Sequence, residues 1–187
     1  MPSKRSGLAV FAAAAAAAVL CATAPRARAG GIFKPGDFVL AIDTDPPIVN
    51  SSYPTPGETP AKVIDGDINT KYLNFGKLNT GFIVVPSAPS IVQSFVLGTA
   101  NDDTRRDPTS YQLFGTNSPI SSTDNSGGMA EPWTMISSGS LSLPDTRLTL
   151  TPAVNVTNST SYSAYKMIFP TVKDNAANSM QLGEAQF

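Results

Sequence analysis

Length, composition and charge restrict the classes to which this chain can belong. Its 187 residues include 13 basic and 14 acidic side chains and no histidine. The lack of histidine excludes Ser-His-Asp and Cys-His catalysis, and also zinc or copper sites with histidine ligands. A slightly acidic balance argues against nucleic acid as a partner, because such proteins present a basic face.

The first 29 residues have the features of a signal peptide. Lys4 and Arg5 precede an alanine-rich apolar run over residues 8–24, and small residues flank the arginine of residues 27–29. This order is typical of secretory signals, and the run is short of the roughly 20 residues that a membrane helix needs. We therefore expect a secreted, extracellular protein that can associate with a cell surface, with no membrane insertion after signal removal.

The mature chain, residues 30–187, is expected to form one monomeric domain. Its length is sufficient for a sizeable core, and no repeat or linker divides it. Signal removal takes away the single cysteine, Cys21, so no disulfide is expected. Because the sequence stops at Phe187 without a sorting tail, we expect either a freely released protein or a piece of a longer one.

Short runs of β-branched and aromatic residues between turn residues indicate an all-β domain. The run at 90–99 alternates apolar and polar residues, which predicts that Val92, Phe95 and Leu97 lie in the core. Eight to ten short strands favour a β-sandwich or jelly roll. The expected strands are 38–42, 72–75, 81–85, 90–99, 111–116, 133–136 with 141–143 as a hairpin-like pair, 147–150, 165–169 and 180–187.

Polar segments separate these strands. The proline-rich residues 50–60 are expected to form an irregular loop, and the charged residues 101–108 form another. Residues 117–131 are polar and contain a Gly-Gly pair, which leaves little to bury. We expect a long, exposed and flexible insertion there.

An acidic turn, Asp65-Gly66-Asp67, is followed closely by Thr70. Ca²⁺ takes about six to eight oxygen ligands, so this turn can supply several of them without completing the shell. Glu184, near the end of the chain, is available as a distant carboxylate. The alternative is an ordinary Asp-Gly turn that needs no metal.

Five motifs follow one another along the mature chain: Ala61-x-x-x-Asp65-Gly66-Asp67-x-x-Thr70-x-Tyr72, Asp107-Pro108-x-x-Tyr111-x-Leu113-x-Gly115-Thr116-Asn117, Trp133-x-x-Ile136, Tyr165-Lys166-Met167-x-Phe169 and Met180-Gln181-Leu182-Gly183-Glu184. Together they resemble the galactose-binding-like superfamily, which includes discoidin (coagulation factor 5/8 type C) domains and family 32 carbohydrate-binding modules. The segment at 70–75 is similar to the variant in exported bacterial proteins, some of which carry a PEP-CTERM sorting tail.

The resemblance implies an eight-stranded antiparallel jelly-roll β-sandwich. In many members a calcium ion ties the first acidic loop to the last strand, and its role would be structural because it binds only the folded state. By position, the implied ligands are the backbone carbonyls of Lys62, Asp67 and Gly183, the carboxylates of Asp65 and Glu184, and the carbonyl and hydroxyl of Thr70.

The chain also departs from the family. Tyr72 stands where tryptophan is frequent, and Trp133 matches a core tryptophan of the fold. Sugar-contacting residues of the carbohydrate-binding members often include a histidine or an exposed loop tryptophan. The family's galactose-binding constellation therefore does not transfer to this chain.

A ligand is expected on the loops at one end of the sandwich. Arg105 and Arg106, close to Asn101, offer donors suited to sugar hydroxyls or to a carboxylated sugar. The alternative is that neighbouring aspartates pair locally with the two arginines and shape the loop. Tyr53, in the proline-rich loop, is a candidate for stacking on a pyranose ring.

Two functions remain open. The first is a non-catalytic secreted module that binds carbohydrate, or an extracellular glycoconjugate, on a cell surface or in a matrix. The second is a structural or adhesive surface protein that uses the sandwich as a calcium-stabilised scaffold. A glycosidase with paired carboxylates is disfavoured because Asp65, Asp67 and Glu184 are assigned to calcium, so we expect no enzymatic activity.

Overall fold

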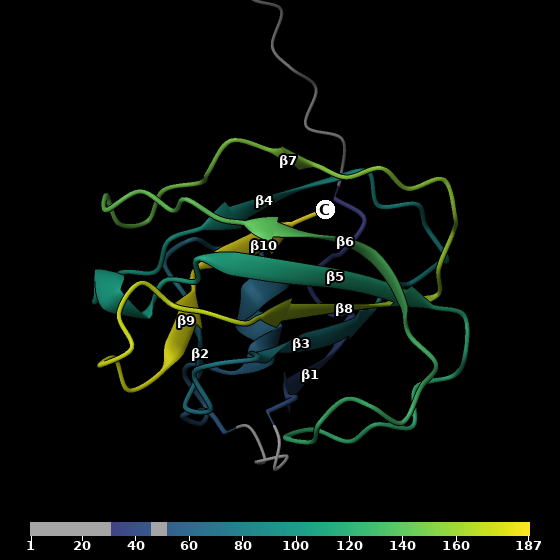
Figure 1. Cartoon of the computed structure of the whole chain (residues 1–187), viewed down its shortest axis with the longest axis horizontal. Helices are drawn as coiled ribbons and strands as arrows, with labels where there is room; N and C mark the ends of the chain where they lie inside the picture. The colour runs from purple at the N-terminus through teal and green to yellow at the C-terminus, as the bar shows by residue number, and fades with distance from the viewer. Residues whose placement is uncertain (1–30, 46–51) are drawn as a thin grey trace, which may run out of the picture.

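The computed structural model describes residues 31–45 and 52–187, so the predicted signal peptide lies outside the described residues. All strands of its three sheets pair antiparallel. The sheets have the orders β1-β3-β8-β5-β6, β10-β4-β7 and β2-β9 (Figure 1). The elements are β1 (Phe38–Asp43), the 3-10 helix η1 (Pro60–Ile64), β2 (Tyr72–Asn74), β3 (Thr80–Val85), β4 (Ser94–Gly98), the 3-10 helix η2 (Thr104–Arg106), β5 (Ser110–Thr116), β6 (Thr134–Ser140), β7 (Val154–Asn155), β8 (Ala164–Phe169), β9 (Met180–Leu182) and β10 (Glu184–Gln186).

The main core lies between the five-stranded sheet and the smaller sheets. Alternate residues of β3 and β8, such as Phe82 and Met167, point into it, and β4 contributes Phe95 and Leu97 from the other side. These two residues of β4 and the preceding Val92 are buried, as the alternation at 90–99 predicts. The predicted all-β sandwich is confirmed.

The outer face of the five-stranded sheet is apolar as well. Leu40, Ile42, Ile83 and Ile168 form a second buried cluster there. Because an apolar sheet face must be covered, another part of the chain has to lie on it.

Residues 117–133 supply that cover. Trp133 and Ile120 pack against the outer cluster, and Glu131 is only 6% exposed. Its carboxylate accepts hydrogen bonds from the backbone N–H groups of Ser121 and Ser122 at 2.6 and 2.7 Å. Most residues of 117–131 are exposed or half-buried, as expected for an insertion, but with Trp133 the segment also shields an apolar sheet face that the sequence did not predict. Its flexibility stays a prediction. Trp133 contacts this outer cluster and is half-buried, instead of lying in the main core.

The same segment also covers one edge of the sheet. The N–H of Asn125 donates to the carbonyl of Ala41 at 2.9 Å, and the N–H of Asp43 donates to the carbonyl of Ser126 at 3.0 Å. Unpaired strand edges invite pairing with other chains, so this contact protects β1.

Several strand predictions differ from the structure. β6 runs unbroken over the residues expected to begin a hairpin and pairs with β5, with a register shift beside Leu113, while Leu143 is buried in the main core. At 147–150 only Leu150 forms a bridge, to Gly98. The two-residue strand β7 was not expected, because two residues are too few to show an alternating apolar and polar pattern.

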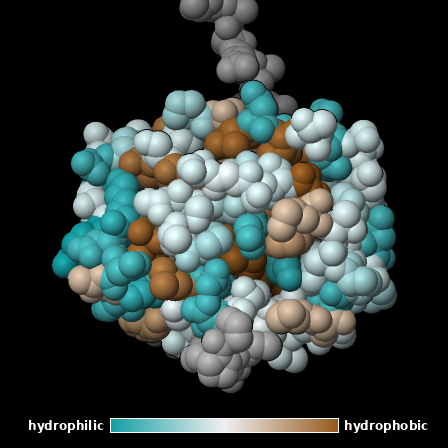
Figure 2. All heavy atoms as spheres, viewed as in Figure 1, coloured by the Kyte–Doolittle hydropathy of each residue, from teal (hydrophilic) through white to brown (hydrophobic). Residues whose placement is uncertain are grey.

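The sandwich has two loop ends. The end that carries η2 includes residues 75–79, 101–109 and 170–178, and we call it the η2 end. Its short helix lies at the left of Figure 1, and hydrophilic side chains gather there in Figure 2. Within the described residues no helix has the length and apolar character needed to cross a membrane.

Candidate functional site

The acidic loop folds around one carboxylate. Asp65 directly follows η1, and its Oδ1 accepts a hydrogen bond from the N–H of Asp67 at 3.0 Å. Its Oδ2 accepts one from the hydroxyl of Thr70 at 2.8 Å. Gly66 has a φ of +79°, a left-handed conformation that glycine adopts without strain. The turn is therefore closed by its own side chains.

Glu184 reaches this turn from the far end of the chain. Its Oε2 accepts a hydrogen bond from the N–H of Gly66 at 3.1 Å, and the residue is 3% exposed. The preceding residue, Gly183, donates its N–H to the carbonyl of Gly98. The structure thus brings the predicted acidic loop and the predicted terminal carboxylate together.

The orientation of the other oxygens agrees with the implied calcium ligands. The carboxylate of Asp67 accepts hydrogen bonds from the backbone and side-chain amides of Asn69, which lower its pKa. Its carbonyl lies 3.1 Å from the hydroxyl of Thr70. The side chain of Asp67 is thus engaged in the turn, and its carbonyl is the oxygen beside Thr70.

The donor chemistry fits a hard cation. Among residues 31–45 and 52–187 no three His, Cys, Asp or Glu side chains form a metal-binding group. The site would combine the carboxylates of Asp65 and Glu184 with carbonyl and hydroxyl oxygens, a set that suits Ca²⁺. The ammonium of Lys62 lies 3.3 Å from Asp65 Oδ2, so a bound cation would compete with it for that oxygen.

The η2 end begins with a tightly paired arginine. Asp103 accepts hydrogen bonds from Nε and Nη2 of Arg105 at 2.9 and 2.8 Å. These bonds lower the pKa of Asp103 to about 2. Local pairing, the alternative raised for this loop, is what the structure shows for Arg105, although its side chain remains 57% exposed.

Arg106 instead links two loops. Its Nε donates to Oδ1 of Asn178 at 3.1 Å, and its guanidinium lies 3.5 Å from Asp102 and 3.6 Å from Asp103. Asn101 is exposed on the same loop. Three of the predicted ligand residues therefore lie at one end of the sandwich.

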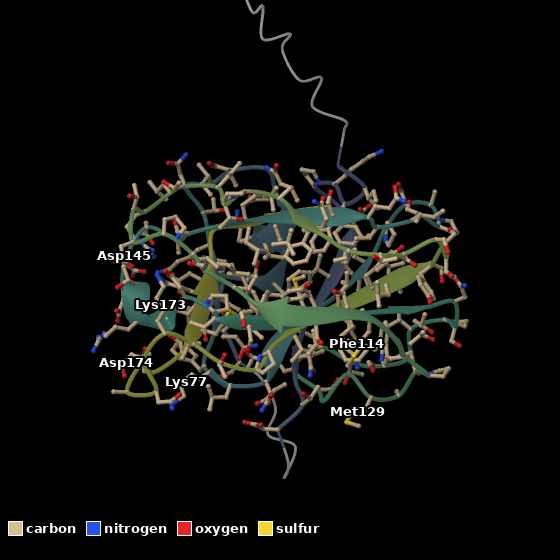
Figure 3. The ribbon with its side chains drawn as sticks, turned by 45° about the horizontal axis from the view of Figure 1, so that its top comes forward. Lys77, Phe114, Met129, Asp145, Lys173 and Asp174 are labelled. Atoms are coloured by element: carbon tan, nitrogen blue, oxygen red, sulfur yellow. The ribbon has the colours of Figure 1, made fainter. Side chains whose placement is uncertain are left out.

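A buried carboxylate anchors this end from below. Asp107 is fully buried, and it accepts hydrogen bonds from Nη1 and Nη2 of Arg147 at 2.8 and 2.6 Å. Lys173 donates to the same carboxylate at 3.2 Å. Figure 3 shows Lys173 beside Asp145, its second partner at 3.0 Å. Charged side chains thus fix residues 101–109 to the 170–178 loop.

Sequence reasoning missed two features of the η2 end. Lys71 is 7% exposed and lies 2.8 Å from Asp102 and 3.4 Å from Glu58. Phe75 was expected within a strand, but the strand ends at residue 74 and the ring is 47% exposed. Gly76, directly after Phe75, was the sequence signal that the strand could end before residue 75.

Tyr53 does not join the arginines in any described contact. Its hydroxyl donates to Oδ2 of Asp124 at 2.6 Å, and this hydrogen bond raises its pKa to about 12. Its ring packs against the main core. Tyr53 therefore holds the 117–133 cover, and stacking of its ring on a sugar stays a prediction.

A hollow of about 640 Å³ lies elsewhere. It is bounded by the segment at 31–35, the acidic loop and the outer faces of β4 and β10. Its walls are mostly apolar and include the charged residues Lys34 and Glu184. Among its lining residues are none of the four predicted saccharide ligands, Tyr53, Asn101, Arg105 and Arg106.

Comparisons with known proteins identify the fold. The scan against protein families and the search of curated proteins found no match. Among solved structures, the chain is similar to the Clostridium perfringens module CpGH89CBM32-5 in complex with GalNAc-β-1,3-galactose, with a TM-score of 0.56, 13% identity and coverage of 80% of this chain and 93% of that one.

Two further similarities agree with it. The family 32 module of C. perfringens NanJ in complex with galactose gives a TM-score of 0.53 at 14% identity, covering 79% of this chain and 97% of that one. A chitosan-binding module from a Paenibacillus chitosanase/glucanase gives 0.56 at 11% identity, covering 83% and 96%. The chain therefore has the galactose-binding-like β-sandwich fold of family 32 carbohydrate-binding modules.

Proposed function

We propose that this protein is a non-catalytic, secreted module that binds carbohydrate through its η2 end and is stabilised by a calcium ion. The observation that carries the proposal is the convergence of three loops at that end, which present arginine, amide and aromatic side chains. Ion pairs to the buried Asp107 hold these loops from below. Arg106 and Asn178 join two of these loops directly. Ligand sites on rigid sandwiches are commonly formed by such loops.

Similar solved structures support this proposal. Two of them are complexes with GalNAc-β-1,3-galactose and with galactose, and the third is a chitosan-binding module. A non-catalytic role is supported by the state of the carboxylates at the η2 end: Asp102, Asp103 and Asp107 each pair with a basic side chain. A general acid or base must lie within hydrogen-bond reach of the substrate, whereas these carboxylates are engaged by the protein's own cations.

A structural calcium ion is supported by the closure of the acidic loop on Glu184. The ion would join an early turn to the last strand, and it would supply binding energy only to the folded state. Lys62, Asp67, Thr70 and Gly183 would contribute carbonyl oxygens beside the two carboxylates.

The test is a saccharide screen followed by calorimetric titration of the strongest hits with calcium-loaded protein. Arg106→Gln should weaken binding about tenfold, the effect of losing one charge-assisted hydrogen bond, while the domain still unfolds in one cooperative transition. Lys34→Gln, on an exposed lysine at the hollow, is the matched control and should bind normally. No binding to any neutral or acidic oligosaccharide would contradict the proposal.

A further inference from the structure

The β2–β3 turn at the η2 end, residues 75–79, carries the exposed aromatic residue Phe75 two positions before Lys77. We propose that Phe75 and Lys77 determine the specificity of the saccharide site, and that the sugar they select carries a carboxylate, as a uronic acid does. This inference rests on the proposed function and names the substrate class of the same site.

The exposure of Phe75 is the first observation. Within the described residues only Phe75 and Phe38 are aromatic and strongly exposed, at 47% and 56%. Phe38 begins β1 beside Val85, whereas the turn precedes Thr80 at the opposite end of the sheet. An aromatic side chain left in water on a loop tip offers a flat apolar face, which the C–H face of a pyranose ring can cover.

The turn is held rigidly in place. The buried Asn74 accepts a hydrogen bond from the N–H of Gly76 at 2.9 Å, and the hydroxyl of Thr80 donates to the carbonyl of Lys77 at 3.1 Å. Lys77 and Asn79 have φ values of +65° and +53°, which are costly for residues other than glycine and are frequent at functional sites. A turn fixed in this way loses little entropy when it binds a ligand.

The charge of Lys77 is the second observation. Its Nζ donates to the backbone carbonyl of Asn175 at 2.8 Å, and no ion pair joins it to a carboxylate among the described residues. The other described basic side chains of the η2 end are ion-paired with carboxylates: Lys71, Arg105, Arg106, Arg147 and Lys173. A ligand carboxylate would therefore meet a cation whose charge is not already balanced.

The turn and the arginine loop form one surface. Asn175, the partner of Lys77, lies on the 170–178 loop, and so does Asn178, the partner of Arg106. The N–H of Asp174 on that loop donates to the carbonyl of Arg105 at 3.1 Å. Figure 3 shows Lys77, Asp174 and Lys173 at the same end of the molecule. One oligosaccharide can therefore contact the turn and the arginine loop together.

A carboxylate on the β1 side of the turn is already engaged. The side-chain amide of Asn79 donates to Asp45, and the N–H of Asp45 donates to Asp43. Asp43 is buried, so Asp45 and Asn79 are the groups that can accept hydrogen bonds from sugar hydroxyls, while Lys77 takes the acidic group. The five-residue turn thus carries an apolar ring and a cation, and its Asn79 holds a hydrogen-bond acceptor, Asp45, beside it.

The test compares matched neutral and acidic ligands, oligogalactose and oligogalacturonate, by calorimetry on the full chain. The wild type should bind the acidic oligosaccharide about tenfold more tightly at low salt, and raising the salt concentration should reduce this preference. Lys77→Gln should remove the preference and keep the weaker neutral binding. Phe75→Ala should weaken both ligands, whereas Phe38→Ala and Lys34→Gln should change neither.

Equal binding of the two ligands by the wild type, or an unchanged preference in Lys77→Gln, overturns the inference. Saccharide binding that is lost in Arg106→Gln but unaffected by Phe75→Ala and Lys77→Gln overturns it while the proposed function stands. Failure to bind either ligand or any sugar in the wider screen overturns both.

Discussion

Removal of Arg147 should destabilise the η2 end strongly. Its guanidinium makes two hydrogen bonds, at 2.8 and 2.6 Å, to Asp107, a carboxylate with 0% exposure. Breaking a buried ion pair by deleting one partner costs about 3–5 kcal/mol, because a buried charge is left behind. Lys173 remains 3.2 Å from Asp107, so we expect a loss near the lower limit, about 3 kcal/mol.

Thermal and urea unfolding of Arg147→Met measure this loss. For a domain of this size it corresponds to a decrease in Tm of about 6–12 °C. The matched control is Arg105→Met. Arg105 pairs with Asp103, and its side chain is 57% exposed. Exposed pairs contribute roughly 0–1 kcal/mol, so this variant should unfold close to the wild type. Equal stabilities of Arg147→Met and Arg105→Met would refute the reasoning about burial.

Three other predictions concern the acidic loop, the outer cover and the sheet. Calcium chelation should lower the Tm of the wild type. If the ion is present at a hundred times its Kd, its removal should reduce the free energy of unfolding by about 2.7 kcal/mol, and Glu184→Gln should lose this response. Burial lowers the pKa of Lys166 to about 8 from 10.5, so the unfolded chain binds more protons between these values and stability should rise with pH from about 8 by up to about 1.4 kcal/mol per unit; Lys166→Met should lose that slope in urea titrations at each pH. Gly81→Ala should fail to fold stably, because a Cβ there would lie 1.8 Å from the carbonyl oxygen of Met167, whereas Gly57→Ala meets no atom within 4 Å and should be tolerated.

Each of these predictions has an outcome that contradicts it. A melting curve that chelator leaves unchanged would remove the support for a structural ion. Identical pH slopes in the wild type and Lys166→Met would show that the buried ammonium does not titrate near pH 8. A normally folded Gly81→Ala would contradict the close contact between β3 and β8, which circular dichroism can check.

Much of the fold and of the acidic loop was predictable from the sequence. Local signals decide both: alternating apolar residues place Phe95 and Leu97 in the core, and the sequence Asp65-Gly66-Asp67 predicts a tight turn. The order of the motifs along the chain relates this turn to Glu184, which is distant in sequence. The contact between Gly66 and Glu184 bears this out.

The outer cover could not be predicted in the same way. Residues 117–133 are mostly polar, and their composition does not reveal that Ile120 and Trp133 lie on an apolar sheet face. That face becomes evident only when both sides of β3 and β8 are known to be buried. The buried Glu131 is stable there because Ser121 and Ser122 supply its hydrogen bonds: burial raises the pKa of this carboxyl, and these bonds more than offset the effect.

The ligand residues were predicted only in part. The sequence places Arg105 and Arg106 on a loop, but which aspartate pairs with each depends on the path of that loop. The unpaired charge of Lys77 depends on three loops that are distant in sequence. The exposure of Phe75 depends on where β2 ends, since one further residue of strand would bury or redirect the ring.

Chemical-shift mapping of the amide groups during titration with the best-binding oligosaccharide tests the central claim most directly. We expect the shifted amides to lie in residues 75–79, 101–107 and 173–178, the three loops of the η2 end. Shifts confined to residues 31–35 and 91–96 around the hollow, or no shifts at saturating saccharide, would contradict the account.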